Sequence, residues 1–335
     1  MTTKMTRRDF AAAALALPGS FASRVQAAGK AEITVGITLD TRPDWYAHDS
    51  FMRSLDEVSE VGYHWVETFW PYISQWENSA QELQDVLSKR HLQLETASNS
   101  PRFNSGMRIN FWDPALRAGT IEDHMRAVRF LHGFRCDHFK INCGDPVPKT
   151  PAIYTNMSAG FNELGKRISD LGMKFGVHAH TGSIFETQQD VDAIMEQTDP
   201  KHVYFILDTG HVTMAGMDPV ALTRTYVSRI IEFHMKDVAP EHKGGYKGPR
   251  RTVSGDGQDQ RGGRATQPGV NAYIGRRQFF ELGNGGVDFP AIKKILDDNR
   301  WKGWMTVELD STETTAKESC AVSKKYLEMV LGLKV

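Results

Sequence analysis

Short apolar stretches alternate with longer amphipathic stretches along most of the chain. Apolar stretches of five to eight residues are typical of strands buried on both faces, and the longer stretches have the spacing of helices that pack one face. This pattern predicts strands at residues 33–38, 64–70, 92–98, 138–144, 175–180, 203–208, 230–236 and 303–310. It predicts helices at residues 48–62, 79–90, 121–134, 159–173, 188–198, 218–229, 290–300 and 320–333.

The regular alternation of strands and helices determines the expected fold class. Eight strand–helix units in about 300 residues predict an α/β fold, a single-domain (β/α)8 TIM barrel over residues 29–335. No Gly-x-Gly-x-x-Gly motif follows the first strand, which argues against a dinucleotide-binding sheet.

One long segment, residues 239–286, interrupts the alternation between the seventh strand and the next helix. A loop of this length in a compact domain is usually either functional or flexible. Because the segment leaves the carboxyl end of a barrel strand, we expect a lid, a contact between subunits, or a solvated insertion. The segment is rich in glycine and carries the basic residues Lys243, Lys247, Arg250, Arg251, Arg261, Arg264, Arg276 and Arg277.

Residues 1–28 have the pattern of an export signal. Arg7 and Arg8 precede Phe10 and an apolar run rich in alanine and leucine, and small residues follow near Ala27. Paired arginines before such a run are typical of the twin-arginine pathway. The run is too short for a permanent membrane anchor. We therefore expect a periplasmic protein, carried by the twin-arginine export machinery and free of the membrane after cleavage.

Composition excludes several classes of protein. The chain of 335 residues is 40% hydrophobic and 24% charged, as in ordinary globular domains. Its net charge of −1 gives no general attraction to nucleic acid. Three cysteines, Cys136, Cys143 and Cys320, predict neither a disulfide framework nor a zinc knuckle.

Polar side chains of the kind that bind metals occur at the ends of four consecutive predicted strands. They are His180, Asp208, His234 and Glu308. Active sites of TIM barrels lie at the carboxyl ends of the strands, so we expect these side chains to converge. Imidazole and carboxylate ligands suit a divalent ion: we expect Mn²⁺ first, with Mg²⁺, Co²⁺, Fe²⁺ and Zn²⁺ as alternatives. No thiolate is among them, so a structural zinc site is not expected.

Such a site predicts chemistry next to a carbonyl group. A divalent ion that binds a carbonyl and an adjacent hydroxyl acidifies the carbon between them and stabilises the resulting enediolate. A nearby base removes the proton. Return of the proton to the neighbouring carbon gives isomerisation, its return to the other face gives epimerisation, and loss of a β-leaving group gives elimination.

Four segments resemble a known family. They are GVHAHTGSIFET (176–187), FILDTGHVTMAGMDP (205–219), RIIEFHMKDV (229–238) and GNGGVDFPAIKKILDDNRWKGWMTVELD (283–310). Together they resemble the xylose-isomerase-like barrel superfamily, which contains sugar isomerases, tagatose 3-epimerase and inosose dehydratase. The motifs H-x-H-x-G, D-T-G-H, H-x-K-D and G-x-x-D-F-P-A-I are most similar to inosose dehydratase-type members. The resemblance covers about residues 33–330 and does not specify a substrate.

The resemblance implies roles for the strand-end residues. Asp208, His234 and Glu308 resemble the metal ligands of strands six to eight. His211 resembles a histidine that contacts substrate oxygens, and Lys236 resembles a substrate-site lysine. Glu308 and Lys236, together with His180, are the expected catalytic residues.

The fifth strand departs from the family's epimerases. There the ligand is a glutamate that is also one of two opposed acid–base carboxylates, whereas our register places His180 at that position. His178 or Glu186 takes its place as ligand if the register shifts, and both are otherwise expected to contact substrate. The departure favours the dehydratase-like branch.

Further residues are candidates for substrate contacts. Glu67 ends the second predicted strand and is expected to bind a sugar hydroxyl, and Trp70 either stacks on a sugar or belongs to the core. Lys140 and Asn142 end the fourth strand and are expected to face the substrate. Asn99 follows the third strand and is a weaker candidate.

These observations lead to one expected function and several alternatives. We expect a metal-dependent isomerase or epimerase acting on a small sugar, keto-sugar or glycoside. The first alternative is a lyase on the same fold, either like inosose dehydratase or cleaving 3-keto-glycosides by β-elimination. A non-catalytic binding protein and a metal-dependent endonuclease are further alternatives, and the near-zero net charge argues against the endonuclease. The resemblance also makes a homo-oligomer an expectation.

Overall fold

A computed structural model describes residues 30–39, 51–99, 107–246, 278–310 and 312–335. The expected export signal and residues 247–277 of the long basic segment lie outside these ranges. Among the described helices, none combines the length and apolarity needed to cross a membrane.

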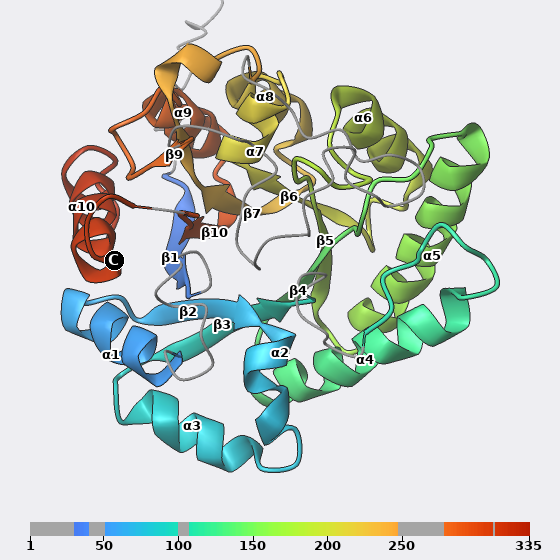
Figure 1. Cartoon of the computed structure of the whole chain (residues 1–335), viewed down its shortest axis with the longest axis horizontal. Helices are drawn as coiled ribbons and strands as arrows, with labels where there is room; N and C mark the ends of the chain where they lie inside the picture. The colour runs from blue at the N-terminus through green and yellow to red at the C-terminus, as the bar shows by residue number, and fades with distance from the viewer. Residues whose placement is uncertain (1–29, 40–50, 100–106, 247–277, 311) are drawn as a thin grey trace, which may run out of the picture.

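Eight parallel strands form a closed barrel in the order β1-β10-β7-β6-β5-β4-β3-β2 (Figure 1). The barrel closes where the first strand pairs with the last, from Glu32↔Lys302 to Ile37↔Val307. The predicted TIM barrel is therefore confirmed. The strands are β1 (Glu32–Thr38), β2 (Trp65–Phe69), β3 (Gln93–Ser98), β4 (His138–Asn142), β5 (Lys174–His178), β6 (Tyr204–Asp208), β7 (Ile230–Met235) and β10 (Lys302–Val307).

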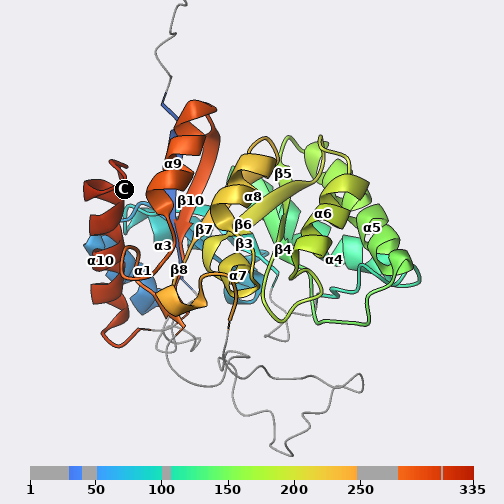
Figure 2. The same ribbon diagram turned by 90° about the horizontal axis from the view of Figure 1, so that it is seen from above.

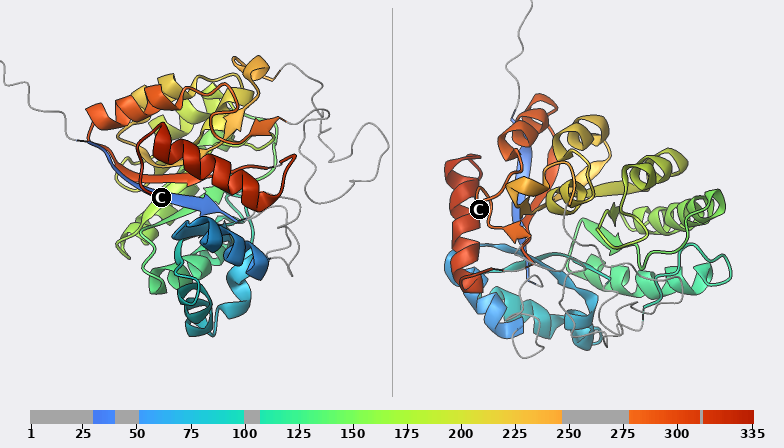
Figure 3. Two further views of the ribbon diagram at one scale, coloured as in Figure 1. Left: turned by 90° about the vertical axis from the view of Figure 1, so that its left-hand side faces the viewer. Right: turned by 45° about the horizontal axis from the view of Figure 1, so that its top comes forward.

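Helices surround the barrel on its outside (Figures 1 and 3). The helices α1 and α10, which are far apart in the sequence, lie side by side and are joined by an ion pair between Glu60 and Lys317. The helices are α1 (Phe51–Val61), α2 (Trp70–Ile73), α3 (Ala80–Ser88), α4 (Arg117–Gly133), α5 (Pro151–Ser169), α6 (Gln188–Gln197), α7 (Thr209–Met214), α8 (Pro219–Tyr226), α9 (Phe289–Asp298) and α10 (Ala316–Met329), with short 3-10 turns η2 (Ser74–Trp76) and η3 (Pro240–His242).

Some elements begin or end where the periodicity does not predict. The helix α5 begins eight residues before its predicted start, at Pro151, because Thr150 caps it by accepting a hydrogen bond from the Ile153 amide. Proline at a first helical position needs no amide partner, so the start is compatible with the sequence. The short helices α2 and α7 were not predicted, because four to six residues are too few to show helical periodicity.

The two faces of each strand differ in chemistry. Side chains that point outward, such as Phe139 and Ile141 of β4, are apolar and fully buried under the helices. Side chains that point inward are largely charged and contact partners on strands that are not their neighbours. Glu232 of β7 and His138 of β4, for example, meet across the interior at 2.9 Å. The interior of this barrel is thus an ionic core rather than the layers of branched apolar side chains common in TIM barrels.

A second, two-stranded sheet joins the two ends of the long segment. Strand β8 (Asp237–Val238) pairs antiparallel with β9 (Phe279–Phe280). The Asp237 carboxylate accepts backbone hydrogen bonds from Gly283, Gly285 and Val287 at 2.9–3.0 Å. A side chain at position 285 would collide with this carboxylate, so glycine is required there. The sheet lies on the same side of the barrel as α7 (Figure 2).

Candidate metal centre

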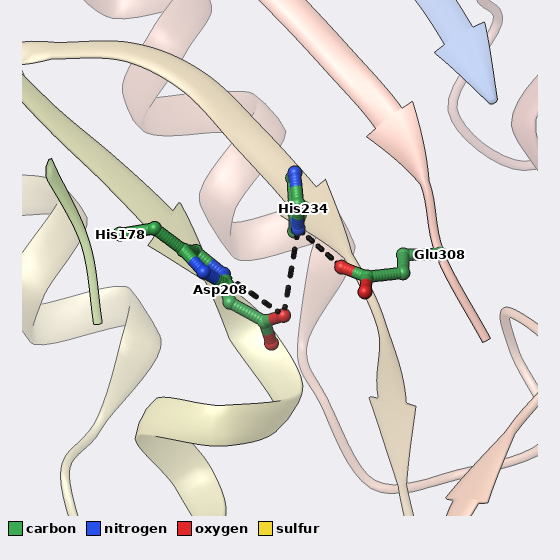
Figure 4. A group of neighbouring side chains, drawn as sticks. All are labelled: His178, Asp208, His234 and Glu308. Carbon is green, nitrogen blue, oxygen red and sulfur yellow. Dashed lines mark ion pairs between the residues drawn. The ribbon is translucent and has the colours of Figure 1, made fainter. Parts of the chain in front are cut away.

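Four side chains meet at the carboxyl ends of β5, β6, β7 and β10. They are His178, Asp208, His234 and Glu308, and Figure 4 shows them pointing toward a common centre. One nitrogen or oxygen atom of each lies within 4.8 Å of the others. Asp208 Oδ2 lies 3.5 Å from His178 Nε2 and 3.7 Å from His234 Nδ1, and His234 Nδ1 also contacts Glu308 Oε2.

The backbone positions these side chains through the register of the strands. Asp208 is aligned with His234, and Asp208 is the last residue of β6 whereas His234 is the last but one of β7. Asp208 also caps α7, since its Oδ1 accepts a hydrogen bond from the His211 amide at 2.7 Å, which leaves Oδ2 to face the centre. Glu308 directly follows β10, and its amide donates to the Met235 carbonyl at 3.1 Å.

The four facing atoms fit a bound cation. They are His178 Nε2, Asp208 Oδ2, His234 Nδ1 and Glu308 Oε2, and within the described part of the chain each is buried without a hydrogen-bond partner. The four atoms lie within ion-pair range of one another but make no hydrogen bonds. Buried polar atoms without hydrogen bonds are uncommon, and four that face one point are the pattern expected at a cation site. Two imidazoles and two carboxylates are a donor set suited to Mn²⁺, Fe²⁺, Co²⁺, Zn²⁺ or Mg²⁺.

Local electrostatics keep three of these ligands in the protonation state that a metal requires. Burial opposes ionisation, but the charge of Lys236 holds the pKa of Asp208 well below its ordinary value. In the same way, Lys236 and His234 overcome burial and lower the pKa of Glu308. Burial lowers the pKa of His178 to about 4, so its imidazole is neutral at neutral pH. Ionised carboxylates and a neutral imidazole are the metal-binding forms.

Two neighbouring groups have similar composition but already contain a cation. In the first, Glu67 and Glu232 flank His234, and Lys140 Nζ lies 2.5 Å from Glu67 Oε1. In the second, Glu95 and Glu232 flank His138, whose two ring nitrogens contact carboxylates of Asp137 and Glu232 at 2.7 and 2.9 Å. Burial opposes the charge, but these two carboxylates raise the pKa of His138 to about 10. His138 is therefore an imidazolium. Burial and Lys140 lower the pKa of His234, but Glu308 and Glu67 raise it above its ordinary value, so charge alone does not separate the groups. The group at the strand ends is the better candidate because all four of its members direct a buried atom without a hydrogen bond at the same point.

Lys236 lies at the edge of the candidate metal centre. Its Nζ is 3.4 Å from Asp208 Oδ2 and 3.1 Å from Glu308 Oε1. Asp310 Oδ1 and His211 Nε2, each 3.1 Å away, hold the ammonium from the other side. Burial opposes the charge, but the surrounding carboxylates raise the pKa of Lys236 above its ordinary value, so the side chain is protonated at neutral pH.

The structure groups His178 rather than His180 with the other three ligands. Alternate residues of a strand share a face, so periodicity does not separate the two histidines. Strand β5 ends at His178, and His180 lies in the following turn, where its amide donates to the Phe185 carbonyl. The ring of His180 packs against that of His211, with centroids 3.6 Å apart. Glu186 lies outside the four-residue group, immediately before the α6 cap.

The other sequence candidates lie behind the ligands. Glu67 Oε2 contacts His234 Nε2 at 3.1 Å, and Lys140 binds Glu67, so both are fully buried under the centre. Asn142 contacts His178, and Asn99 contacts Asn142. Trp70 is 1% exposed and packs edge-to-face on Phe130, as a core residue does.

Two polar residues near the centre were not singled out by the sequence analysis. Glu232 contacts His234 from inside the barrel at 3.2 Å, and Asp310 holds Lys236. Both lie two residues from a predicted ligand, so the period of two along a strand places each on the same face as that ligand. That spacing in IIEFHM and VELD is the pattern that could have indicated them.

The fold and the candidate centre define a TIM barrel with an imidazole–carboxylate site at the carboxyl ends of its strands. Residues 55–326 match the model of the Xylose isomerase-like TIM barrel family, and the chain belongs to this family.

Curated relatives and solved structures agree with this assignment. The chain is 26% identical over 310 residues to an inosose dehydratase of Clostridium botulinum (strain Alaska E43 / Type E3), covering 88% of this chain and 94% of that protein. It is 26% identical over 320 residues to an inosose dehydratase of Klebsiella pneumoniae (strain 342), covering 89% and 96%.

Two solved structures share the fold. A sugar phosphate isomerase/epimerase from Parabacteroides distasonis has a TM-score of 0.63 at 17% identity, covering 95% of this chain and all of that one. A Xylose isomerase-like TIM barrel protein from Mycobacterium smegmatis, solved in complex with magnesium, has a TM-score of 0.63 at 15% identity, covering 90% and 96%.

Proposed function

We propose that the protein binds one divalent metal ion at His178, Asp208, His234 and Glu308 and removes a proton next to the carbonyl of a sugar-like ketone. The observation that carries this proposal is the set of four buried facing atoms without hydrogen-bond partners. When bound, the ion would polarise the carbonyl and stabilise the negative charge that forms as the proton leaves. Binding of sugar-like substrates is supported by the names of the curated relatives.

The residues around the centre divide into a base and a proton donor. Glu308 is ionised, and we assign it the role of base that removes the proton. Lys236 carries a proton and lies 3.1 Å from Glu308 Oε1, so it can donate to an oxygen that leaves the neighbouring carbon. His211, 3.1 Å from Lys236, can orient a substrate hydroxyl.

This pairing favours elimination of water. Glu308 takes the proton, the electrons of the broken C–H bond form a C=C bond, and the β C–O bond breaks. The departing hydroxide takes a proton from Lys236 and leaves as water. The strand-five position that holds a carboxylate in the family's epimerases is here His178, which is a weak base because burial lowers its pKa to about 4. A second base for epimerisation is thus missing at this position.

Isomerisation is the second candidate. One base suffices for it, because the proton can leave one carbon and return to its neighbour on the same face. The single carboxylate Glu308 beside Lys236 is compatible with that reaction as well as with dehydration.

Proton NMR in D₂O separates the candidates. The Mg²⁺- or Zn²⁺-loaded protein would be incubated with inososes, ketoses and 3-keto-glycosides, with Glu308→Gln as the inactive control. Loss of water or of an aglycone with a new vinylic resonance supports a lyase. Deuterium incorporation with an intact skeleton supports an isomerase or epimerase. Absence of any exchange in metal-loaded protein would argue against both.

We also propose that residues 1–28 direct export to the periplasm by the twin-arginine route. The proposal rests on Arg7, Arg8 and the apolar run that follows. Replacement of both arginines by lysine keeps the charge, so retention of that variant in the cytoplasm during cell fractionation would support a twin-arginine signal. Unchanged export would contradict it.

A further inference from the structure

Asn142 holds the ring of His178 on the side away from the candidate metal centre. His178 Nδ1 lies 2.6 Å from Asn142 Oδ1, and His178 Nε2 faces Asp208 Oδ2. The Asn142 amide is oriented by its own donor, since Nδ2 lies 3.5 Å from the Asn99 carbonyl. Its oxygen is therefore the atom that faces the ring, and it accepts the proton of Nδ1. An imidazole that donates from Nδ1 has its lone pair on Nε2, the atom that faces the centre.

Asn99 in turn fixes the backbone of Asn142. Its Oδ1 accepts a hydrogen bond from the Asn142 amide at 2.7 Å, and its Nδ2 donates to the Asn142 carbonyl at 3.0 Å. Strands β3 and β4 are paired only through Ser98 and Lys140 in the regular register. Beyond this pair, the Asn99 side chain makes the hydrogen bonds to the β4 backbone that a neighbouring strand would otherwise make. The side chain is completely buried.

His124 of α4 completes the chain of contacts. Its Nδ1 donates to the Thr120 carbonyl at 2.7 Å, so its Nε2 accepts from Asn99 Nδ2 at 3.1 Å. The ring is completely buried and packs on Phe111, with centroids 5.1 Å apart. A continuous series of hydrogen bonds therefore runs from α4 through β3 and β4 to the candidate ligand on β5.

We infer that Asn142 is a positioning residue for His178, held in place by Asn99 and His124, and that it sets the affinity of the metal centre. This inference rests on the proposed metal site. It assigns Asn142 to the outer shell of the metal rather than to the substrate contact expected from the sequence. Outer-shell partners of this kind change metal affinity by about 10–100-fold when they are removed.

The test compares metal affinities of Asn142 variants. Asn142→Leu keeps the volume and removes the acceptor, whereas Asn142→Asp keeps an oxygen acceptor for Nδ1. Asn162→Leu is the matched control, because Asn162 lies on α5 and contacts only Gln197 and Asp199 in the described hydrogen bonds. Dissociation constants for Co²⁺ and Zn²⁺ would be measured by competition with a chromophoric chelator, and the visible Co²⁺ spectrum reports the loss of a nitrogen ligand.

We expect Asn142→Leu to weaken Co²⁺ and Zn²⁺ binding about 10–100-fold and to change the Co²⁺ spectrum. Asn142→Asp should restore both readouts to within a few-fold, and Asn162→Leu should match wild type. If Asn142→Leu does not fold, Asn142→Ala removes the same acceptor without adding volume. Wild-type protein that binds neither ion would overturn the metal site itself. Wild-type protein that binds, with an Asn142→Leu variant of equal affinity, would overturn only the role of Asn142.

Discussion

Burial and hydrogen bonding, rather than residue type, distinguish ligands from neighbours at the scale of single residues. His178, His180 and His211 lie close together, yet only His178 directs a buried nitrogen without a hydrogen-bond partner toward two carboxylates. The ring of His211 is engaged by Thr181 and by Lys236. The surroundings therefore assign different roles to three side chains of the same type.

If the four proposed residues bind the metal, variants of these residues should lose metal, whereas variants of their neighbours should keep it. Asp208→Asn and Glu308→Gln each remove a charge from the centre and should lower metal content to less than a tenth of wild type after dialysis against a micromolar ion. His180→Ala removes a ring outside the four-residue group and should retain the metal. Metal analysis of the dialysed proteins checks this. Full metal content in both carboxylate variants would contradict the site.

A second residue-scale prediction concerns acid stability. Burial lowers the pKa of His124 to about 4, against an ordinary value of 6.5. Between these two values the unfolded chain binds a proton that the folded chain does not, so the folded state loses stability as pH falls from 6.5 to 4. The full effect is about 3 kcal/mol.

Urea unfolding at a series of pH values tests the role of His124. His124→Gln should be less stable than wild type at pH 7 but should lose less stability on acidification. Parallel pH dependences of the free energy of unfolding in the two proteins would show that His124 does not titrate as expected.

At the scale of elements, the space around a helical glycine determines whether alanine can replace it, as two positions in α4 and α5 illustrate. Glycine in a helix is normally less favourable than alanine by about 1 kcal/mol. A side chain at Gly165 of α5 would collide with the carbonyl of His202, whereas one at Gly133 of α4 meets nothing within 4 Å. The two positions therefore form a matched pair.

We expect Gly165→Ala to destabilise the protein by about 1–3 kcal/mol, because a backbone carbonyl cannot move aside easily. Gly133→Ala should be neutral or stabilising by up to about 1 kcal/mol. Urea denaturation at pH 7 measures both. Equal effects of the two substitutions would mean that α5 shifts to accommodate the methyl group.

The sequence predicts the strands of the barrel and three of the proposed ligands, but it does not predict the fourth ligand or its contact with Asn142. Apolar runs locate all eight barrel strands, and their order along the chain is sufficient to predict the barrel. Asp208, His234 and Glu308 could be predicted because each lies at or next to the end of a strong apolar strand. The choice between His178 and His180 could not, because it depends on where β5 ends. The contact of Asn142 with His178 depends on the barrel stagger, which no local pattern encodes.

At the scale of the whole molecule, the barrel interior concentrates charge. The carboxyl groups of Glu67, Glu95, Asp208, Glu232 and Glu308 and the basic groups of Lys140, Lys236, His138 and His234 are all buried there. A divalent ion at the strand ends would give the facing atoms of the four proposed ligands a partner that only the folded protein offers. The folded protein should therefore depend on the metal for part of its stability.

Metal removal tests this dependence. Protein stripped with a chelator should unfold at lower temperature, and readdition of the ion at about 100 times its dissociation constant should recover about 3 kcal/mol. The Asp208→Asn variant is the control and should respond weakly. Unfolding temperatures of wild-type protein that are identical with and without the ion would contradict a metal that binds only the folded state.

The pairing of the first barrel strand with the last has a consequence for synthesis. The proposed ligands emerge from the ribosome in the order 178, 208, 234 and 308, and the last follows the strand that closes the barrel. A nascent chain that lacks β10 holds at most three of them and an unclosed sheet. The complete ligand set therefore exists only after β10 and Glu308 have been made, and full metal uptake becomes a marker of chains whose barrel can close.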